Sequence, residues 1–175
     1  WTPLPDQTGF KEIKSLAMGH YLSVHNGKIT DHQYHTLQFK QTLAVNSEQE
    51  AKALIQEQLY NSVRLRLRSD VEVGVYLSGG VDSAIIAALV KEISSQPLST
   101  FSIEFEDSEF NESPEQQMVA RHLGTRHSPL RISYDDISRA FPKAIYHAEI
   151  PVFRSAFIPM YLLSQHTRKH NIKVV

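Results

Sequence analysis

The stretch that decides the fold is Val73-Gly74-Val75-Tyr76-Leu77-Ser78-Gly79-Gly80-Val81-Asp82-Ser83. Its first five residues form an apolar run with β-branched side chains, which is typical of a buried strand. After Ser83, apolar residues from Ile85 to Ile93 recur at helical spacing and so share one face of a helix. The stretch therefore predicts a strand, a glycine turn and a helix in direct succession.

The turn in this stretch has the features of an anion-binding loop. Gly79 and Gly80 lack the Cβ atoms that would keep a phosphate away from the backbone. The free N–H groups and the dipole of the helix start favour an anion, and Ser78 and Ser83 add hydroxyl donors. Asp82 is out of place beside an anion unless a cation lies between them. We therefore predict that Asp82 is a ligand of Mg²⁺.

This loop differs from two common nucleotide-binding loops. It has no G-x-x-x-x-G-K-[ST] pattern with a lysine beside the glycines, and it is not the G-x-G-x-x-G turn of dinucleotide-binding folds. One interpretation is a turn whose glycines serve packing alone. However, the hexapeptide Ser-Gly-Gly-x-Asp-Ser resembles the PP-loop of ATP pyrophosphatases, which split ATP between the α and β phosphates. That resemblance implies a site for pyrophosphate.

The composition limits the classes of function. The chain has 175 residues, 41% of them hydrophobic and 21% charged, which is ordinary for a globular domain. A net charge of −1 does not predict broad binding to nucleic acid or to a membrane surface. No apolar run reaches the roughly 20 residues of a membrane span. Cysteine is absent, which excludes a disulfide framework, a thiolate metal site and a cysteine nucleophile on this chain.

Strands and helices are predicted to alternate along the chain. Asn26-Gly27 joins two short alternating runs and predicts a β-ribbon over 20–35. A helix is expected from the capping box Ser47–Glu50 to about Leu67, with Leu54, Ile55, Leu59 and Val63 facing inward. A second helix should begin at Ser113, where Gln116 completes the capping box, and a short third helix should end after Phe141 because Pro142 breaks it. The remaining expected elements are strands over 98–105 and 127–132, a helix over 156–169, and a strand from Ile172. Strands linked by helices predict parallel pairing with right-handed crossovers.

Two groups of side chains suggest metal binding. His25, His32 and His35 lie in the predicted ribbon, and His166 and His170 have the i, i+4 spacing found in zinc sites. Neither group has an evident full set of ligands, so solvated histidines are the better interpretation. The acidic segment 106–109 follows a predicted strand, where it either holds Mg²⁺ or a substrate amine or forms a plain loop.

Blocks along nearly the whole chain resemble glutamine-dependent asparagine synthetases. These blocks are residues 68–83, 101–107, 124–127, 158–164 and 173–175, with Glu149 and Pro151 ahead of Arg154; residues 19–21 and 26–29 resemble the segment that joins the two domains of that family. Glu72 replaces a frequent proline and Val81 a frequent leucine. The glutaminase domain of the family uses a cysteine nucleophile, so we expect that domain to be missing here.

The resemblance implies a fold class and a domain organisation. The fold is expected to be α/β, a parallel twisted sheet with helices on both faces, of the PP-loop ATP pyrophosphatase or adenine nucleotide alpha hydrolase type. We expect it to be incomplete, because the chain stops within a strand. Residues 1–45 would be an inter-domain segment with a β-ribbon, and residues 46–175 the N-terminal part of a truncated PP-loop synthetase domain.

The resemblance also implies an activity. Aspartate would be converted to asparagine through β-aspartyl-AMP with release of pyrophosphate, using Mg²⁺ and ATP, and ammonia would come from glutamine on the absent glutaminase domain. The family implies a cytoplasmic enzyme, compatible with a homodimer, that has no nucleic-acid or membrane partner. The fragment alone would be inactive. Two alternatives stay open: a PP-loop amide ligase or cyclase acting on another carboxylate, like β-lactam synthetase, and a nucleotide-binding or assembly segment without turnover.

Site residues follow from the same motif match. Ser78, Gly79, Gly80, Asp82 and Ser83 would hold pyrophosphate and Mg²⁺, and the backbones of Leu77 and Ile103 would contact adenine. Arg154 would act in catalysis by facing the phosphates or the acyl-adenylate. The alternative for Arg154 is a structural ion pair, for which Glu149 is the nearest candidate in sequence.

Overall fold

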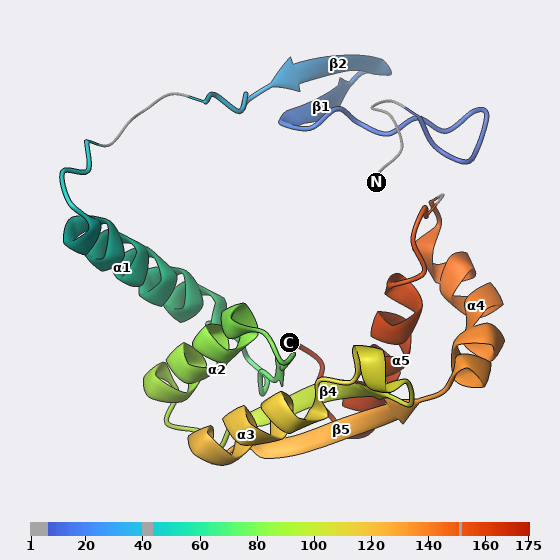
Figure 1. The fold of residues 1–175 in the computed structure, drawn as a ribbon. Helices are drawn as coiled ribbons and strands as arrows, with labels where there is room; N and C mark the ends of the chain where they lie inside the picture. Colours follow the sequence, from blue (N-terminus) through green and yellow to red (C-terminus); the bar gives the residue numbers. More distant parts are fainter. Residues whose placement is uncertain (1–6, 40–43, 151) are drawn as a thin grey trace. The chain divides into compact units, whose positions relative to one another are not determined.

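The computed structural model describes residues 7–39, 44–150 and 152–175, which fall into two units (Figure 1). The first, here called the ribbon unit, consists of residues 1–44 and 142–155. The second, the sheet unit, consists of residues 45–141 and 156–175. Each unit is described by itself.

A two-stranded antiparallel ribbon is the main element of the ribbon unit. Strand β1 (His20–His25) pairs with β2 (Lys28–Gln33). The turn between them has positive φ angles at Asn26 (50°) and Gly27 (74°), as a two-residue turn that matches the twist of a hairpin requires. The predicted ribbon is therefore confirmed.

The sheet unit is built on three parallel strands in the order β3-β4-β5, with bounds β3 Val75–Tyr76, β4 Ser99–Phe105 and β5 Arg126–Ile132. Val75 lies opposite Thr100, which in turn lies opposite His127. On the other side of β3, Val73 forms a parallel bridge with Val174. The predicted parallel sheet is confirmed, and the segment from Ile172 reaches it through this single bridge.

The helices have the bounds α1 Glu48–Arg66, α2 Val81–Ile93, η1 (a 3₁₀ turn) Ser108–Phe110, α3 Ser113–Leu123, α4 Tyr134–Ala148 and α5 Phe157–Lys169. The boundary between the two units falls inside α4, after Phe141. Helix α4 contains Pro142, so the predicted break there is wrong. Ala140 and Ala144 are buried on either side of the proline, and burial of this helix face favours a continuous helix although the ring removes one hydrogen bond. Among the described residues, no helix combines the length and the apolar character needed to cross a membrane.

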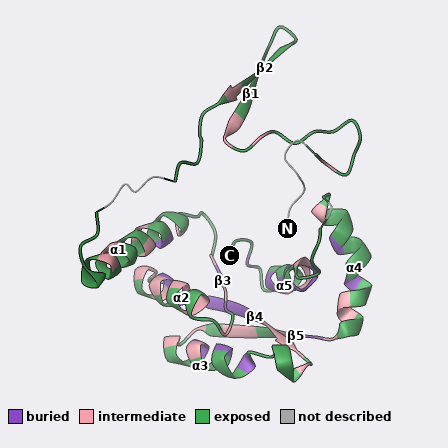
Figure 2. Cartoon of the chain, turned by 45° about the horizontal axis from the view of Figure 1, so that its top comes forward, coloured by how far each residue is buried: buried purple, intermediate pink, exposed green. Residues whose placement is uncertain are grey.

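The two faces of the sheet are covered by different helices. On one face, β3 and β4 pack against α1, α2 and α3 through Val63, Val75, Leu77, Ala87, Leu98 and Ala120. On the other face, Phe101 packs against Leu163 of α5 and against Ile172. The buried residues concentrate on β4 (Figure 2) because both of its faces are covered. This arrangement confirms the predicted α/β fold with helices on both faces.

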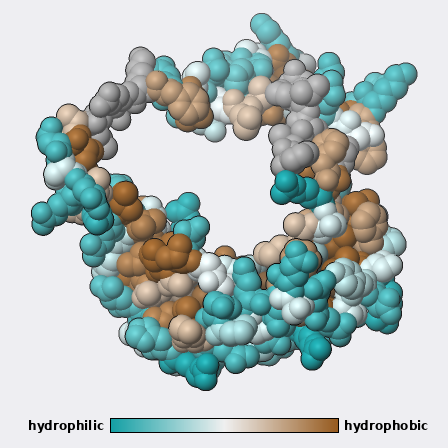
Figure 3. All heavy atoms as spheres, in the orientation of Figure 1, coloured by the Kyte–Doolittle hydropathy of each residue, from teal (hydrophilic) through white to brown (hydrophobic). Residues whose placement is uncertain are grey.

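Helix α1 begins as predicted but buries less than expected. The Ser47 hydroxyl accepts a hydrogen bond from the Glu50 N–H group (3.1 Å), and the Glu50 carboxylate accepts from the Asn46 N–H group (2.9 Å). Ile55 is 59% exposed, so its predicted inward position is wrong. Apolar residues lie on more than one side of this helix, and hydrophobic side chains reach the surface over α1 and α2 (Figure 3).

The start of α3 differs from the predicted capping box. Ser113 is the first helical residue, and its N–H group donates to the Asn111 side chain (3.1 Å). The Gln116 side chain does not fold back to the cap, because it faces the sheet. There its Nε2 atom donates to the Ile103 carbonyl of β4 (3.2 Å), which stabilises the contact between α3 and the sheet.

Two histidines of the sheet unit have a pKa below the ordinary value of histidine. The ring of His127 lies between the Thr100 hydroxyl (3.0 Å from Nδ1) and the Ser102 hydroxyl (3.2 Å from Nε2), and burial lowers the pKa of His127 although Glu104 opposes the shift. Burial also lowers the pKa of His166, with further lowering by the charges of His170 and Lys169.

We expect stability to fall as the pH is lowered below about 6.5, the ordinary pKa of histidine in the unfolded chain. Below that pH the histidines of the unfolded chain bind protons, whereas those of the folded chain stay neutral until the pH reaches their lower pKa values. The stabilisation that is present above pH 6.5 is therefore lost as the pH falls from 6.5 toward the folded-state pKa values. Urea unfolding at pH 7.5 and 5.5 would measure this difference. His127→Gln should reduce it, whereas His122→Gln, on the exposed side of α3, should not. Equal urea midpoints at the two pH values would contradict the expectation.

Candidate functional site

The predicted phosphate loop lies between β3 and α2. The Leu77 N–H group donates to the Phe101 carbonyl (2.8 Å), which extends the pairing of β3 with β4 by one residue. Helix α2 then begins at Val81 with Gly80 as its N-cap residue, and no side chain caps this helix start. The loop Ser78–Gly80 therefore lies at the carboxyl end of a strand and at the uncapped start of a helix, where an anion is favoured.

Two serines hold the loop in shape. The Ser83 hydroxyl accepts from the Ser78 N–H group (3.1 Å), and its oxygen lies 2.8 Å from the Ser78 hydroxyl and 3.1 Å from the Gly80 carbonyl. The Ser78 hydroxyl accepts in turn from the Gly80 N–H group (3.2 Å). The two serines, predicted to donate hydrogen bonds to phosphate, thus also stabilise the loop through hydrogen bonds within it.

A residue that sequence reasoning missed completes the loop. The Gly79 N–H group donates to the Glu112 carboxylate at 2.8 Å, and Glu112 immediately precedes α3. No spacing in the sequence indicates this contact, because 33 residues separate the partners. The bond shows that the Gly79 amide is oriented to bind a negatively charged oxygen.

The two glycines serve different purposes. A Cβ atom on Gly79 would lie 2.8 Å from Cβ of Glu112 and 3.2 Å from Cβ of Glu115, too close for either neighbour to stay in place. A Cβ atom on Gly80 would meet only the Ser78 hydroxyl, at an ordinary 3.4 Å. Gly79 is therefore required by the packing of α3 against the loop, whereas space beside Gly80 is open.

The carboxylates at the loop suit a divalent cation. Asp82 lies in the first turn of α2, is exposed, and forms no hydrogen bond or ion pair through its side chain with another described residue. Glu112 and Glu115 lie next to Gly79. Mg²⁺ typically takes one or two carboxylates together with phosphate oxygens and water. The residues present therefore fit a bound Mg²⁺, and the role of Asp82 as its ligand stays a prediction.

A cavity of about 490 Å³ opens beside the loop at the carboxyl ends of β3 and β4. Its apolar wall consists of Phe101, Ile103, Phe105, Phe110, Met160 and Leu163, and its polar groups come from Ser78, Ser83, Glu109, Glu112 and Gln116. An apolar pocket with a few polar groups next to an anion-binding loop suits a nucleotide, whose base is apolar on its faces and whose phosphates are charged.

The two predicted adenine contacts lie at this cavity, but part of their backbone is already engaged. The N–H group of Leu77 is paired with β4, so only its carbonyl is available. The carbonyl of Ile103 accepts from Gln116 and keeps a second lone pair. Gln116 is 4% exposed, and its Oε1 atom accepts no hydrogen bond from the described residues. The roles of Leu77 and Ile103 stay predictions.

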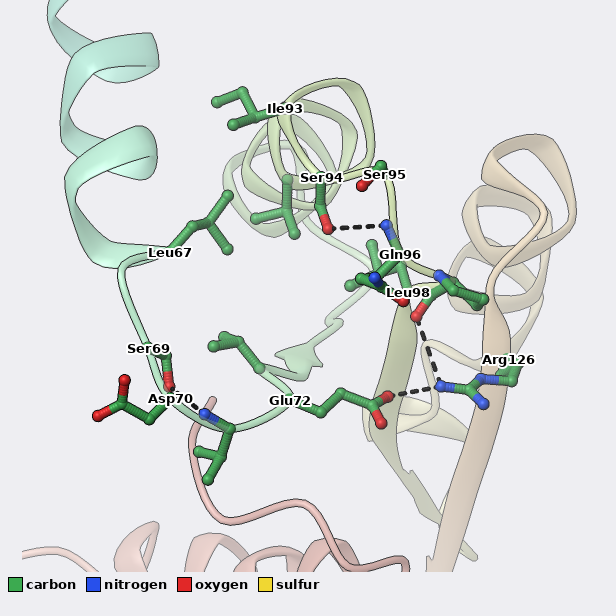
Figure 4. Close-up of a pocket in the computed structure, with 14 residues that line it drawn as sticks. Leu67, Ser69, Asp70, Glu72, Ile93, Ser94, Ser95, Gln96, Leu98 and Arg126 are labelled. Atoms are coloured by element: carbon green, nitrogen blue, oxygen red, sulfur yellow. Dashed lines mark hydrogen bonds and ion pairs between the residues drawn. The ribbon is translucent and has the colours of Figure 1, made fainter.

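A second, larger cavity of about 690 Å³ lies at the opposite, amino-terminal end of β4 and β5 (Figure 4). There the Glu72 carboxylate accepts from the Arg126 guanidinium (2.5 Å) and from the buried Ser99 hydroxyl (2.8 Å). Two of its charged groups, Glu72 and Arg126, thus bind each other, and no helix begins among the described residues that line it. The smaller cavity at the phosphate loop is therefore the candidate site.

Arg154 belongs to the ribbon unit, so the geometry of the sheet unit does not test its predicted contact with phosphate. Pro151, part of the same predicted loop, lies outside the described residues.

In the acidic segment, the Asp107 carboxylate accepts from the Glu109 N–H group (3.0 Å) and from the Tyr134 hydroxyl (2.9 Å), and this second hydrogen bond raises the pKa of Tyr134. Asp107 thus shapes its own turn.

The histidine pair of α5 has a different partner from the zinc considered above. The Nε2 atoms of His166 and His170 lie 2.9 and 3.1 Å from the Ser128 hydroxyl. The Nδ1 atom of His170 is 3.0 Å from the His166 carbonyl, which can only accept, so the neutral ring carries its proton there. Across the described part of the chain, no group of three His, Cys, Asp or Glu side chains is arranged to hold a metal ion.

The chain is similar to known proteins in sequence and in structure. It is 32% identical over 160 residues to asparagine synthetase [glutamine-hydrolyzing] 1 of Bacillus subtilis, covering 90% of this chain and 25% of that protein. It is 28% identical over 189 residues to the amidase chyE of Penicillium rubens, covering 98% of this chain and 28% of that protein. In structure it matches the NH3-dependent NAD synthetase of Campylobacter jejuni with a TM-score of 0.48 and 22% identity, over 70% of this chain and 54% of that one.

The family assignment rests on a match to a whole family. The chain spans about a quarter of the length of the two curated relatives above. The sequence profile of asparagine synthase matches residues 54–175, which include the whole phosphate loop and every strand of the sheet unit. On this match, the chain belongs to the asparagine synthase family.

Proposed function

We propose that the intact protein forms an amide on aspartate at the expense of ATP. The observation that carries the proposal is the Gly79 amide, which already holds a carboxylate oxygen at 2.8 Å beside a nucleotide-sized cavity. Family membership supports ATP-dependent ligation, and the similarity to an asparagine synthetase supports aspartate as the acceptor.

The proposed reaction has two steps. A side-chain carboxylate oxygen of aspartate bonds to the α-phosphorus of ATP, and the bond from that phosphorus to the bridging oxygen breaks, so that pyrophosphate leaves with the electron pair. Ammonia then bonds to the acyl carbon of β-aspartyl-AMP, AMP leaves with the electron pair of the acyl–oxygen bond, and a proton is released. Such transfers depend on positioning and on charge stabilisation.

In this proposal the loop holds the leaving pyrophosphate. The Gly79 amide and the Ser78 and Ser83 hydroxyls bind its oxygens, and the backbones of Leu77 and Ile103 position adenine. Arg154 stabilises charge at the phosphates or at the acyl-adenylate. Mg²⁺, bound by Asp82 and phosphate oxygens, would neutralise the charge that develops on the leaving group.

Exchange of labelled pyrophosphate into ATP tests the proposal on the intact protein. We expect exchange that depends on aspartate and on Mg²⁺, because the first step is reversible when ammonia is withheld. Glutamate and a buffer without amino acid serve as controls. Exchange with another carboxylate but not with aspartate would overturn the assignment of the acceptor.

A second candidate keeps the ATP chemistry and changes the acceptor. The match to an amidase over 98% of the chain supports a PP-loop amide ligase or cyclase acting on another carboxylate, as in a β-lactam synthetase. The exchange assay separates the two candidates when a panel of carboxylates replaces aspartate. If the protein binds nucleotide but no carboxylate supports exchange of pyrophosphate into ATP, the result would favour a segment that binds nucleotide or forms an assembly without catalysing a reaction.

The remaining parts of the proposal concern partners. Ammonia would come from glutamine on a glutaminase domain, and residues 1–45 would link that domain to the synthetase domain that starts at residue 46. We further propose that the protein works in the cytoplasm, where ATP and aspartate are available, and that it forms a homodimer. Analytical ultracentrifugation of the intact protein would test the dimer.

A further inference from the structure

The loop between β3 and α2 presents three N–H groups, at Ser78, Gly79 and Gly80, and each has a partner. Serine hydroxyls accept from the first and the third, at 3.1 and 3.2 Å. The central N–H group donates to the Glu112 carboxylate at 2.8 Å. The middle amide, and no other of the three, is thus held by an anionic group.

We propose that Glu112 is a built-in competitor for phosphate: its carboxylate occupies the anion position on the Gly79 amide and must leave before a phosphate group binds there. The inference rests on the proposed function of the loop. A charge-assisted hydrogen bond is stronger than a neutral one, and two anions at one amide repel each other. Phosphate must therefore offset the loss of the Glu112 contact.

The surroundings of Glu112 allow this exchange. The residue is exposed and lies at the N-cap position of α3, ahead of the first helical residue. Its side chain can turn away without disturbing the buried contacts of α3, which are made by Gln116 and Ala120. Displacement of Glu112 therefore leaves the core of the sheet unit intact.

A neighbouring glutamate provides a matched control. Glu115 is also exposed, and its Cβ atom would lie 3.2 Å from a Cβ atom placed on Gly79. Its carboxylate forms no hydrogen bond with the described residues of the loop. Glu115→Gln removes the same charge from the same surroundings but leaves the Gly79 amide bound to Glu112. It therefore separates direct competition for that amide from the general electrostatic repulsion of pyrophosphate.

The test is the affinity of the intact protein for inorganic pyrophosphate, by isothermal titration calorimetry with and without Mg²⁺. We expect Glu112→Gln to bind pyrophosphate about tenfold more tightly than wild type, since a neutral amide competes less well. Glu115→Gln should change the affinity by less than about threefold, as for an exposed charge that is screened by salt.

Nuclear magnetic resonance provides a second readout that does not depend on affinity. The Gly79 amide resonance should shift in Glu112→Gln and when pyrophosphate is added to wild type, and it should stay in place in Glu115→Gln. Equal gains in affinity in both variants, or weaker binding in Glu112→Gln, would overturn the inference alone. If wild type and both folded variants bind neither pyrophosphate nor Mg·ATP, the proposed function itself is overturned.

Discussion

Gly79→Ala is expected to lower the affinity for Mg·ATP and pyrophosphate by about 100-fold, because the added methyl group forces a shift of the loop and moves its central N–H group out of position. The added methyl group would lie 2.8 Å from Cβ of Glu112 and 3.2 Å from Cβ of Glu115. Neither atom is the end of a flexible side chain, so the start of α3 or the loop must move. Titration calorimetry with Mg·ATP and with pyrophosphate would measure the effect.

Gly80→Ala is the control for this substitution. It adds the same methyl group one residue later, where the nearest atom is the Ser78 hydroxyl at an ordinary contact distance. We expect Gly80→Ala to unfold at the wild-type temperature, and Gly79→Ala to unfold at a lower one. If the two variants were equally stable and bound nucleotide equally well, the packing role assigned to Gly79 would be wrong.

Asp82→Asn is expected to weaken binding of Mg·ATP by about tenfold or more while the protein stays folded, because a carboxylate bond to a cation is lost and an amide of the same shape replaces it. The Asp82 side chain is exposed and has no partner among the described residues, so the fold does not depend on it. Titrations with Mg²⁺ at fixed ATP would show the loss as a higher midpoint for the metal.

Glu92→Gln provides the matched comparison, because Glu92 is an exposed carboxylate near the other end of α2. It removes the same charge from the same helix and should leave Mg·ATP binding unchanged. An unchanged magnesium midpoint in folded Asp82→Asn would remove Asp82 from the proposed metal site.

The order of elements was largely predictable from the sequence, because local patterns determine it. The Asn26-Gly27 turn, the Ser47 cap and the apolar strand before Ser78 each act within a few residues. The failures have tertiary causes. Ile55 is exposed although its spacing suits a buried face, and α4 continues through Pro142, where Ala140 and Ala144 are buried on either side.

The candidate site was predictable only in part for the same reason. Its backbone, from Leu77 to Ser83, is continuous in sequence, and a motif there can be recognised. Glu112 and Gln116 reach the site because α3 packs beside the loop, and the contact of Glu112 with Gly79 spans 33 residues. A capping signal at Ser113 indicated a helix start but not which side chain that helix would bring to the loop.

The parallel bridge between Val73 and Val174 has a consequence for where a ligand can bind. From β3 the chain proceeds to β4 and then to β5, always outward in one direction, and afterwards returns to the opposite side of β3. The winding of the sheet therefore reverses at β3. In open α/β sheets a ligand binds outside the carboxyl ends of the strands near such a topological switch point, and the cavity at the phosphate loop lies at the carboxyl end of β3. The location of the binding crevice is thus set by the path of the chain, and substitutions in the loop are expected to change its affinity but not its position.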